Sequence, residues 1–259
     1  MSSDLLLVDQ ANGVYTLCLN RPDQFNALSM EMMAEIQDAL ATIAADESAR
    51  CAVLAANGRA FCAGHDLKQM RANPDYAWQD RLFANCSRMM QAIVDLPVPV
   101  IARVQGLATA AGCQLVATCD LAVAVDSARF AVSGINVGLF CGTPAVALTR
   151  NVPIKKAFEM LITGKFISAV QAVENGLINH AVPAEELDGT VAELVEAICS
   201  KSPVAVRNGK AMYRRQKEMT LSEAYQYANG VMAGGMMAAD AAEGIDAFKE
   251  KRAPAWQGR

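Results

Sequence analysis

Two short segments of small residues have the composition and placement that chemistry at a backbone site requires. The first is residues 59–67 (RAFCAGHDL) and the second is residues 104–115 (VQGLATAAGCQL), and each follows a predicted strand and precedes a predicted helix. Free backbone N–H groups at a helix start favour developing negative charge. Two such connections can each aim one N–H at a shared oxygen, which is the requirement for an oxyanion hole. Close packing of a helix on a sheet also calls for small residues, so two ordinary strand-to-helix turns remain the alternative.

Three polar side chains near these segments need a role. His65 has the side chain best suited to general acid or base catalysis near neutral pH, although a helix-start histidine can also simply contact the backbone or a phosphate. Asp66 is predicted to be the N-cap of the following helix. Asp120, which follows Cys119 at a strand start, is interpreted as structural. Cys141 could face the same site, but a buried, inert thiol is the simpler interpretation.

The elements that must position these segments alternate in the first half of the chain. A Gly-containing loop at residues 11–13 predicts a hairpin between two β-like runs. Short apolar strands separated by helices predict a largely parallel sheet covered on both faces. The predicted strands are 5–10, 14–20, 51–56, 100–104 and 121–125, and the predicted helices are 29–46, 75–94 and the Ala- and Gly-rich 106–118.

After about residue 145 the pattern becomes almost entirely helical. Capping boxes predict helix starts after Ser168 and Thr220. Pro203 suits the first turn of another helix, and the last helix is predicted over about residues 238–251. No linker or low-complexity segment separates two independent domains.

Composition excludes several classes of protein. The net charge of -4 argues against a general nucleic-acid binder. Eight cysteines without a C-x-x-C pair, mostly in apolar surroundings, indicate reduced core thiols, and with only two histidines no metal site is predicted. Residues 1–4 (MSSD) do not resemble a targeting segment, and no apolar run reaches about 18 residues. We therefore expect a cytoplasmic protein with no membrane partner.

Three motifs together resemble the crotonase (enoyl-CoA hydratase/isomerase) superfamily. They are Arg21-Pro22 followed by Asn26-Ala27-Leu28, then residues 61–67, then residues 106–114 running into Cys119-Asp120. Each motif is weak alone, but their order and spacing are specific. The resemblance continues to residues 244–248 and so covers nearly the whole chain. Residues 110–117 and 137–141 are similar to the subgroup called enoyl-CoA hydratase domain-containing proteins.

The resemblance implies an α/β fold, a crotonase-like spiral of ββα units with a helical C-terminal region. Residues 1–195 would form the spiral core and residues 196–259 a helical trimerisation region. The assembly would be a homotrimer or a dimer of trimers. The substrate would be an acyl-CoA thioester, with coenzyme A entering as part of the substrate and no covalently bound cofactor.

The same resemblance implies roles for individual residues. The oxyanion hole would consist of the N–H groups of Ala63 and Ala111. The adenine and pantetheine of coenzyme A would lie along residues on two neighbouring segments, Ala27, Ala63, Gly64, His65, Asp66 and Leu67. Near the C-terminus, Phe248 and Lys251 would be further candidates for contacts to the nucleotide.

The chain departs from the family pattern at two catalytic positions. Hydratases of this family use two glutamates as general acid and base, and the corresponding residues here are Gln114 and Gly134. A glutamine can orient a water but cannot exchange a proton at useful pH, and glycine offers no side chain. A positioned acid or base contributes about 10² to 10⁴ in rate, so loss of both argues against hydration.

Three functions therefore remain open. The first is an enzyme of the hydratase/isomerase family whose reaction tolerates Gln114 and Gly134 while the oxyanion hole stabilises an enolate. The second is a CoA-thioester decarboxylase using His65, because Gly-His-Asp is similar to the sequence of methylmalonyl-CoA decarboxylases, although their tyrosine is replaced by Cys141. The third is a non-catalytic acyl-CoA binder.

Overall fold

The chain begins with a β-hairpin. The computed structural model describes residues 5–259, so residues 1–4, on which the expectation about targeting rests, lie outside it. Strands β1 (Leu6–Ala11) and β2 (Val14–Leu19) pair antiparallel around Asn12 and Gly13, which both have positive φ. A Cβ on Gly13 would lie 2.5 Å from the carbonyl oxygen of Ser48, so only glycine fits this turn. The predicted hairpin is confirmed.

Six strands form the larger sheet in the order β1-β2-β3-β5-β7-β10. The strands after the hairpin are β3 (Cys51–Ala56), β5 (Val100–Val104), β7 (Leu121–Val125) and β10 (His180–Val182). Every pairing beyond the hairpin is parallel, and all six residues of β3 are buried. The prediction of a largely parallel, covered sheet is confirmed.

A second sheet of four very short strands was not predicted. Its order is β4-β6-β8-β9, with β4 (Ala60–Cys62), β6 (Leu107–Thr109) and β8 (Arg129–Ala131) parallel and β9 (Ile167–Ser168) antiparallel. The prediction of one helix over residues 106–118 is therefore wrong. That segment forms β6 and then α4 (Ala111–Thr118), with the break at Ala110.

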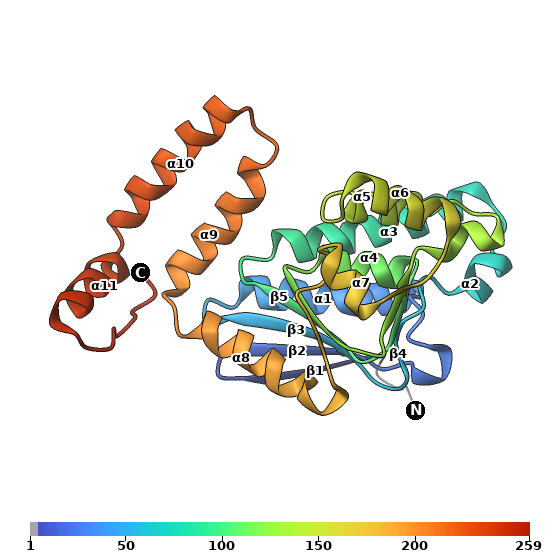
Figure 1. The fold of residues 1–259 in the computed structure, drawn as a ribbon, viewed down its shortest axis with the longest axis horizontal. Coiled ribbons are helices and arrows are strands. Elements are labelled where there is room, and N and C mark those ends of the chain that lie inside the picture. Colours follow the sequence, from blue (N-terminus) through green and yellow to red (C-terminus); the bar gives the residue numbers. More distant parts are fainter. Residues whose placement is uncertain (1–4) are drawn as a thin grey trace.

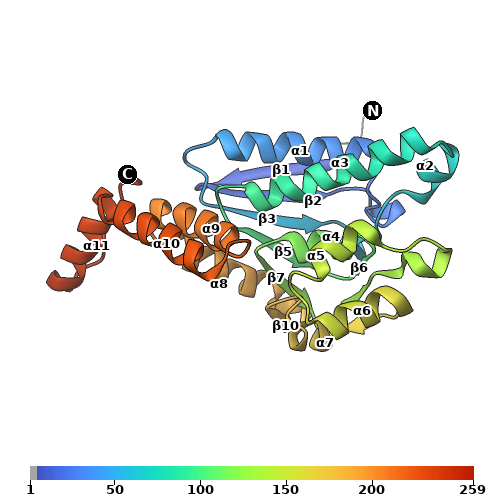
Figure 2. The same cartoon turned by 90° about the horizontal axis from the view of Figure 1, so that it is seen from above.

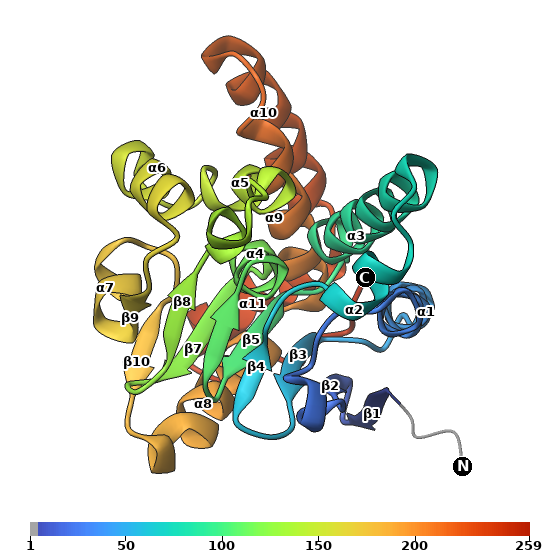
Figure 3. The ribbon, with the colours of Figure 1, turned by 90° about the vertical axis from the view of Figure 1, so that its right-hand side faces the viewer.

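Helices cover the strands on both sides. Figure 3 shows α3, α4 and α5 on one side and α8 on the other. On α1, the predicted buried stripe of Met33, Ile36, Leu40 and Ile43 is confirmed. The helices of the core are α1 (Met30–Ala45), α2 (Leu67–Ala72), α3 (Tyr76–Asp95), α4, α5 (Gly142–Leu148), α6 (Ile154–Thr163), α7 (Ala169–Glu174) and α8 (Leu187–Cys199), with 3-10 segments η1 (Pro22–Gln24), η2 (Ser133–Val137) and η3 (Ala184–Glu186).

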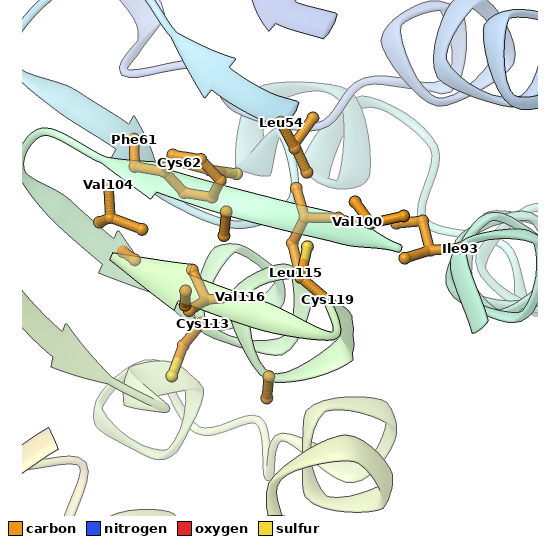
Figure 4. Packing of buried hydrophobic residues seen from close by; sticks show 14 of the residues in the cluster. Leu54, Phe61, Cys62, Ile93, Val100, Val104, Cys113, Leu115, Val116 and Cys119 are labelled. Atoms are coloured by element: carbon orange, nitrogen blue, oxygen red, sulfur yellow. The ribbon is translucent and has the colours of Figure 1, made fainter. Parts of the chain in front are cut away.

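The hydrophobic core lies between the strands and α4. Figure 4 shows Leu54 of β3 and Val100 of β5 beside Leu115 and Cys119, and all four side chains are buried. Six of the eight cysteines are buried, which confirms their predicted place in the core. Burial of apolar side chains in this layer is the main favourable term that fixes α4 against the strands.

Three helices form an arm that extends away from this core, as Figures 1 and 2 show. They are α9 (Pro203–Gln216), α10 (Leu221–Met236) and α11 (Ala239–Glu250), and the predicted capping boxes at Ser168 and Thr220 are both formed. The expected boundary after residue 195 falls inside α8, and the chain leaves the core after Cys199. Between residues 5 and 259 no helix combines the length and apolar character needed to cross a bilayer.

Candidate active site

Three loops meet at one edge of the second sheet. Strands β4, β6 and β8 are parallel neighbours, so their carboxyl ends lie at the same edge. His65, Ala111 and Gly134 each follow one of these strands within three residues. The topology therefore brings together three segments that lie far apart in the sequence.

The loop after β4 is paired with the segment around Leu28. The N–H of Leu28 donates to the carbonyl oxygen of Gly64 at 2.8 Å, and the N–H of Asp66 donates to the carbonyl oxygen of Leu28 at 3.1 Å. The buried side chain of Asn26 donates to the carbonyl oxygen of Ala60 at 2.8 Å. Ala27 and residues 63–67, which the sequence placed in one site, therefore do lie side by side.

Arg21 and Asp66 hold this loop at the start of α2. The Arg21 guanidinium donates to the carbonyl oxygen of Ala27 at 2.8 Å and pairs with the Asp66 carboxylate at 3.1 Å. Asp66 also accepts from the N–H groups of Lys68 and Gln69, which confirms the predicted N-cap. Burial alone would raise the pKa of Asp66, but these hydrogen bonds and Arg21 together hold it below its usual value.

The expectation that the N–H of Ala63 lines an oxyanion hole is wrong. That N–H donates to the carbonyl oxygen of Phe25 at 3.0 Å, and the carbonyl oxygen of Ala63 accepts from Thr109 Oγ1 at 3.1 Å. Two residues further on, the N–H of His65 has no acceptor among residues 5–259. The resemblance identified the right loop, but the free donor in it is that of His65.

The N–H of Ala111 is the second free donor. It is the first residue of α4, and no acceptor for its N–H occurs in the described part of the chain. Gly64 packs directly against it, because a Cβ on Gly64 (φ +98°) would lie 3.3 Å from the Ala111 nitrogen. Ala110, with φ 49° and ψ −120°, holds a conformation that is costly for a residue with a Cβ. Its N–H donates to the carbonyl oxygen of Ala131 at 2.9 Å, which ties the strained turn to β8.

Other small residues in the second segment serve close packing. A Cβ on Gly112 would lie 2.0 Å from the carbonyl oxygen of Cys62, and one on Gly106 would lie 2.3 Å from that of Arg59. The two interpretations of this segment are therefore compatible, since glycines bring the backbones together and the approach leaves the Ala111 N–H beside Gly64.

His65 is half-buried, with its Nε2 fully buried and its ring neutral near pH 7. Its Nε2 is buried without a hydrogen-bond partner in the described structure, and the ring meets Phe83 edge-on at a centroid distance of 5.5 Å. Burial lowers the pKa of His65 to about 4, because the charged imidazolium is poorly solvated there.

Gln114 supplies another unsatisfied polar atom. The residue is 4 % exposed, and its Oε1 is buried with no donor among residues 5–259. Side chains on a helix tilt toward its N-terminus, so Gln114 leans back toward Ala111 in the first turn of α4.

Gly134 has no room for a side chain. A Cβ there would lie 2.7 Å from Cys141 Sγ and 2.6 Å from the carbonyl oxygen of Leu139. The N–H of Gly134 donates to Cys141 Sγ at 3.2 Å. The Cys141 thiol is 7 % exposed, and burial raises its pKa although this hydrogen bond opposes the shift. Cys141 therefore occupies the space that a glutamate at position 134 would have to enter.

Phe248 and Lys251 do not join this site within one chain. Figures 1 and 2 place α11, which carries Phe248 and ends next to Lys251, at the opposite end of the molecule from α2. Phe248 is 86 % exposed. The predicted contacts of both residues to the nucleotide stay predictions.

The fold and this site define a crotonase-like α/β protein with a helical C-terminal arm. The model of the enoyl-CoA hydratase/isomerase family matches residues 9–259, and the chain belongs to that family. The expected fold class and the resemblance are thereby confirmed.

Curated relatives and solved structures agree with this assignment. Enoyl-CoA hydratase domain-containing protein 3, mitochondrial, of Xenopus laevis is 43 % identical over 97 % of this chain and 86 % of its own length. A crystal structure of an enoyl-CoA hydratase from Mycobacterium smegmatis has a TM-score of 0.97 and 56 % identity, covering 98 % of this chain and 99 % of its own. The structure of the human domain-containing protein 3 has a TM-score of 0.95 and 41 % identity, with coverages of 97 % and 100 %.

The expected location needs correction. The vertebrate relatives from Xenopus laevis, Danio rerio, Rattus norvegicus and Homo sapiens are all named as mitochondrial proteins. These names point away from the cytoplasm, so the expectation of a cytoplasmic protein, which rested on residues 1–4 and on the lack of a long apolar run, is wrong.

Proposed function

We propose that this protein binds an acyl-CoA thioester and polarises its carbonyl oxygen with the N–H groups of His65 and Ala111. The observation that carries the proposal is the pair of backbone donors without a protein acceptor, on loops held against each other through Gly64. Ala111 lies at the N-terminus of α4, where the helix dipole favours negative charge. One such donor typically contributes about 10² to 10³ in rate when an oxyanion develops.

The reaction that we propose is stabilisation of an enolate without hydration. The enolate forms when the bound thioester loses an α-proton to water or an α-carboxylate as carbon dioxide, and the electron pair of the broken bond moves onto the thioester oxygen. Neither Gln114 nor Gly134 can move a proton, and Cys141 closes the space beside Gly134. Gln114 Oε1 is positioned to accept a hydrogen bond from the substrate or from an ordered water. We infer the substrate class, acyl-CoA thioesters, from the family. The experiment below determines which acyl group the protein accepts.

The decarboxylase alternative meets a physical obstacle at His65. A group with a pKa of about 4 is protonated in only about one molecule in a thousand at pH 7. His65 is therefore a poor donor for reprotonating an enolate. As a neutral imidazole it can still accept a hydrogen bond at Nε2, which suits substrate binding and is equally compatible with a non-catalytic acyl-CoA binder.

We further propose that a second copy of the chain completes the nucleotide end of the site. Phe248 and Lys251 cannot reach His65 of their own chain, whereas an arm that projects from the core can reach a neighbour. Large apolar side chains gathered in exposed positions mark protein interfaces. A homotrimer or a dimer of trimers would cover them, and the exposed apolar side chains of the arm include Leu221, Tyr225, Met232, Met236 and Met237.

The test uses mass spectrometry of crotonyl-CoA and a malonyl-type CoA thioester incubated with the purified protein, beside titration calorimetry for binding. Ala111→Pro removes one N–H at a first-turn position where proline is tolerated, and Ala111→Gly is the matched control that keeps it. We expect both esters to bind the native protein and crotonyl-CoA to remain unhydrated. Any turnover should fall about 10²-fold in Ala111→Pro only.

Two outcomes would change this proposal. Rapid hydration of crotonyl-CoA would mean that another group replaces both glutamates. Undiminished turnover or binding in Ala111→Pro would show that the N–H of Ala111 does not contact the thioester.

A further inference from the structure

The last residues of the chain fold back along α11. Lys251, with φ 56°, ends the helix in the left-handed conformation and reverses the chain direction. Residues 253–259, here called the strap, then return toward the start of the arm. The N–H of Ala255 donates to Glu243 at 2.6 Å, and Trp256 Nε1 donates to the carbonyl oxygen of Ser200 at 2.8 Å.

Asp240 is the anchor of the strap. Its residue is 2 % exposed, and its carboxylate accepts from Ser202 Oγ at 2.6 Å and from the N–H groups of Gln257 and Gly258 at 2.6 and 3.2 Å. Its own N–H donates to the carbonyl oxygen of Arg259 at 3.1 Å. Removing this carboxylate would leave the buried Ser202 hydroxyl and the N–H groups of Gln257 and Gly258 without their acceptor at once.

Little else holds α11 in place. The helix buries only Asp240 and Ala247. The ring of Trp256 lies on Gly244, since a Cβ there would be 3.1 Å from the ring carbon Cη2. The strap therefore supplies the apolar cover and the buried polar contacts that α11 lacks elsewhere.

The point where the strap is anchored is itself fixed to the core. Arg50 donates to the carbonyl oxygens of Cys199 and Lys201 at 3.0 and 2.5 Å. Arg207 donates to the carbonyl oxygen of Ala49 at 3.1 Å. A continuous set of contacts thus runs from the loop before β3, through Ser202 and Asp240, to α11.

We infer that Asp240 and the strap are positioning elements for the nucleotide end of the substrate, because they set where α11 presents Phe248 and Lys251 to acyl-CoA held by a second copy of this chain. The inference rests on the proposed function. Asp240 does not touch the ligand in this scheme, and it acts through the orientation of α11.

Two thioesters that differ only in the nucleotide provide the test. Isothermal titration with crotonyl-CoA and with crotonyl-pantetheine is compared for the full-length protein, Asp240→Ala, Trp256→Ala and the control Asp246→Ala, which removes a carboxylate from the exposed side of the same helix. We expect the dissociation constant for crotonyl-CoA to rise about tenfold in the two strap variants. That for crotonyl-pantetheine should stay within about twofold, and Asp246→Ala should match the native protein for both esters.

Each other outcome overturns the inference. Equal weakening of both esters would mean a general loosening of the protein, and unchanged binding of both would mean that α11 needs no strap. If the native protein binds neither ester, the proposed function fails together with this inference. If it binds both esters and the strap variants have the same dissociation constants as the native protein, only this inference fails. Circular dichroism and light scattering check fold and assembly, and Trp256→Ala carries the test if Asp240→Ala does not fold.

Discussion

At the scale of single residues, the buried polar atoms without a hydrogen-bond partner say most about where a ligand binds. Leaving one such atom unpaired costs about 1 to 3 kcal/mol. His65 Nε2 lies in the loop after β4 and Gln114 Oε1 in the first turn of α4, and both segments follow strands that end at the same edge of the second sheet. A ligand that supplies partners for both atoms would remove that cost on binding. The backbone N–H groups of His65 and Ala111 add two further groups at this edge that only a ligand or water can satisfy.

The protonation of His65 can be measured directly. With only two histidines in the chain, NMR can follow each imidazole separately. We expect the His65 signals to stay those of a neutral ring from pH 8 to about pH 5, because burial lowers its pKa to about 4. A His65 signal that titrates near pH 6.5 would contradict the buried, neutral ring.

The same shift gives stability a pH dependence. Below pH 6.5 His65 is protonated in the unfolded chain, whereas in the folded chain it stays neutral down to about pH 4. The contribution of neutral His65 to the free energy of unfolding is therefore fully present above pH 6.5 and is lost as the pH falls toward 4. The loss is about 1.4 kcal/mol per pH unit in that window. Urea unfolding at pH 7 and pH 5 should show a smaller difference for His65→Gln than for the native protein.

A side chain at position 134 should conflict with Cys141. We expect Gly134→Ala to lower the free energy of unfolding by about 1 to 3 kcal/mol, because its Cβ would overlap the Cys141 sulfur and the Leu139 carbonyl oxygen. Cys141→Ala in the same chain should recover only part, since the clash with Leu139 remains. Strict additivity of the two substitutions in urea unfolding would show that the side chains do not meet.

At the scale of elements, the cap of α2 governs the His65 loop. Asp66→Ala removes both the cap and the ion pair with Arg21 and should cost about 1 to 2 kcal/mol in urea unfolding. Asp66→Asn keeps a capping oxygen and should cost clearly less. Equal losses would mean that the ion pair, rather than the cap, carries the effect.

Long periodic elements could be predicted from sequence, and very short ones could not. The stripe on α1 repeats often enough to define the helical period, and the six apolar residues of β3 form a run long enough to mark a buried strand. Strands β4, β6 and β8 have three residues each, which are too few to show an alternation. The break at Ala110 gave no signal because positive φ is rare for alanine.

Site residues divide in a similar way. The loop of residues 63–67 and the first turn of α4 could be placed from motifs, because both follow strands in a recognisable order. Which N–H in the loop is free depends on Phe25, which is distant in the sequence. The carbonyl oxygen of Phe25 accepts from the N–H of Ala63, so that N–H is not available to a ligand. The positions of Phe248 and Lys251 follow from the direction of the arm, which no local pattern encodes.

At the scale of the whole molecule, a half-buried cluster of charges joins the arm to the core. Asp120, at the start of β7, pairs with Lys210 and Arg214 of α9 at 2.7 Å each and accepts from the N–H of Val100 at 2.8 Å. The Lys210 side chain is 7 % exposed, and its pKa is lowered by burial although Asp120 opposes the shift. The structural role predicted for Asp120 is thus accounted for.

Removal of Asp120 should uncouple this cluster. We expect Asp120→Ala to cost about 3 to 5 kcal/mol, because the buried Lys210 ammonium loses its counter-charge. The double variant with Lys210→Met should be more stable than Asp120→Ala, since it removes the stranded charge. Urea unfolding measures both, and a double variant less stable than Asp120→Ala would contradict the argument.

The order of the strands also bears on how this chain can fold while it is being synthesised. In both sheets the spatial order rises steadily with sequence, β1-β2-β3-β5-β7-β10 and β4-β6-β8-β9. Each strand that emerges can therefore add to the open edge of a sheet already begun, and none has to be inserted between strands that have paired. Asp120 is an exception to this vectorial order, because Arg214 leaves the tunnel 94 residues later. Until then the nascent core carries an acid whose two basic partners, Lys210 and Arg214, have not yet been synthesised.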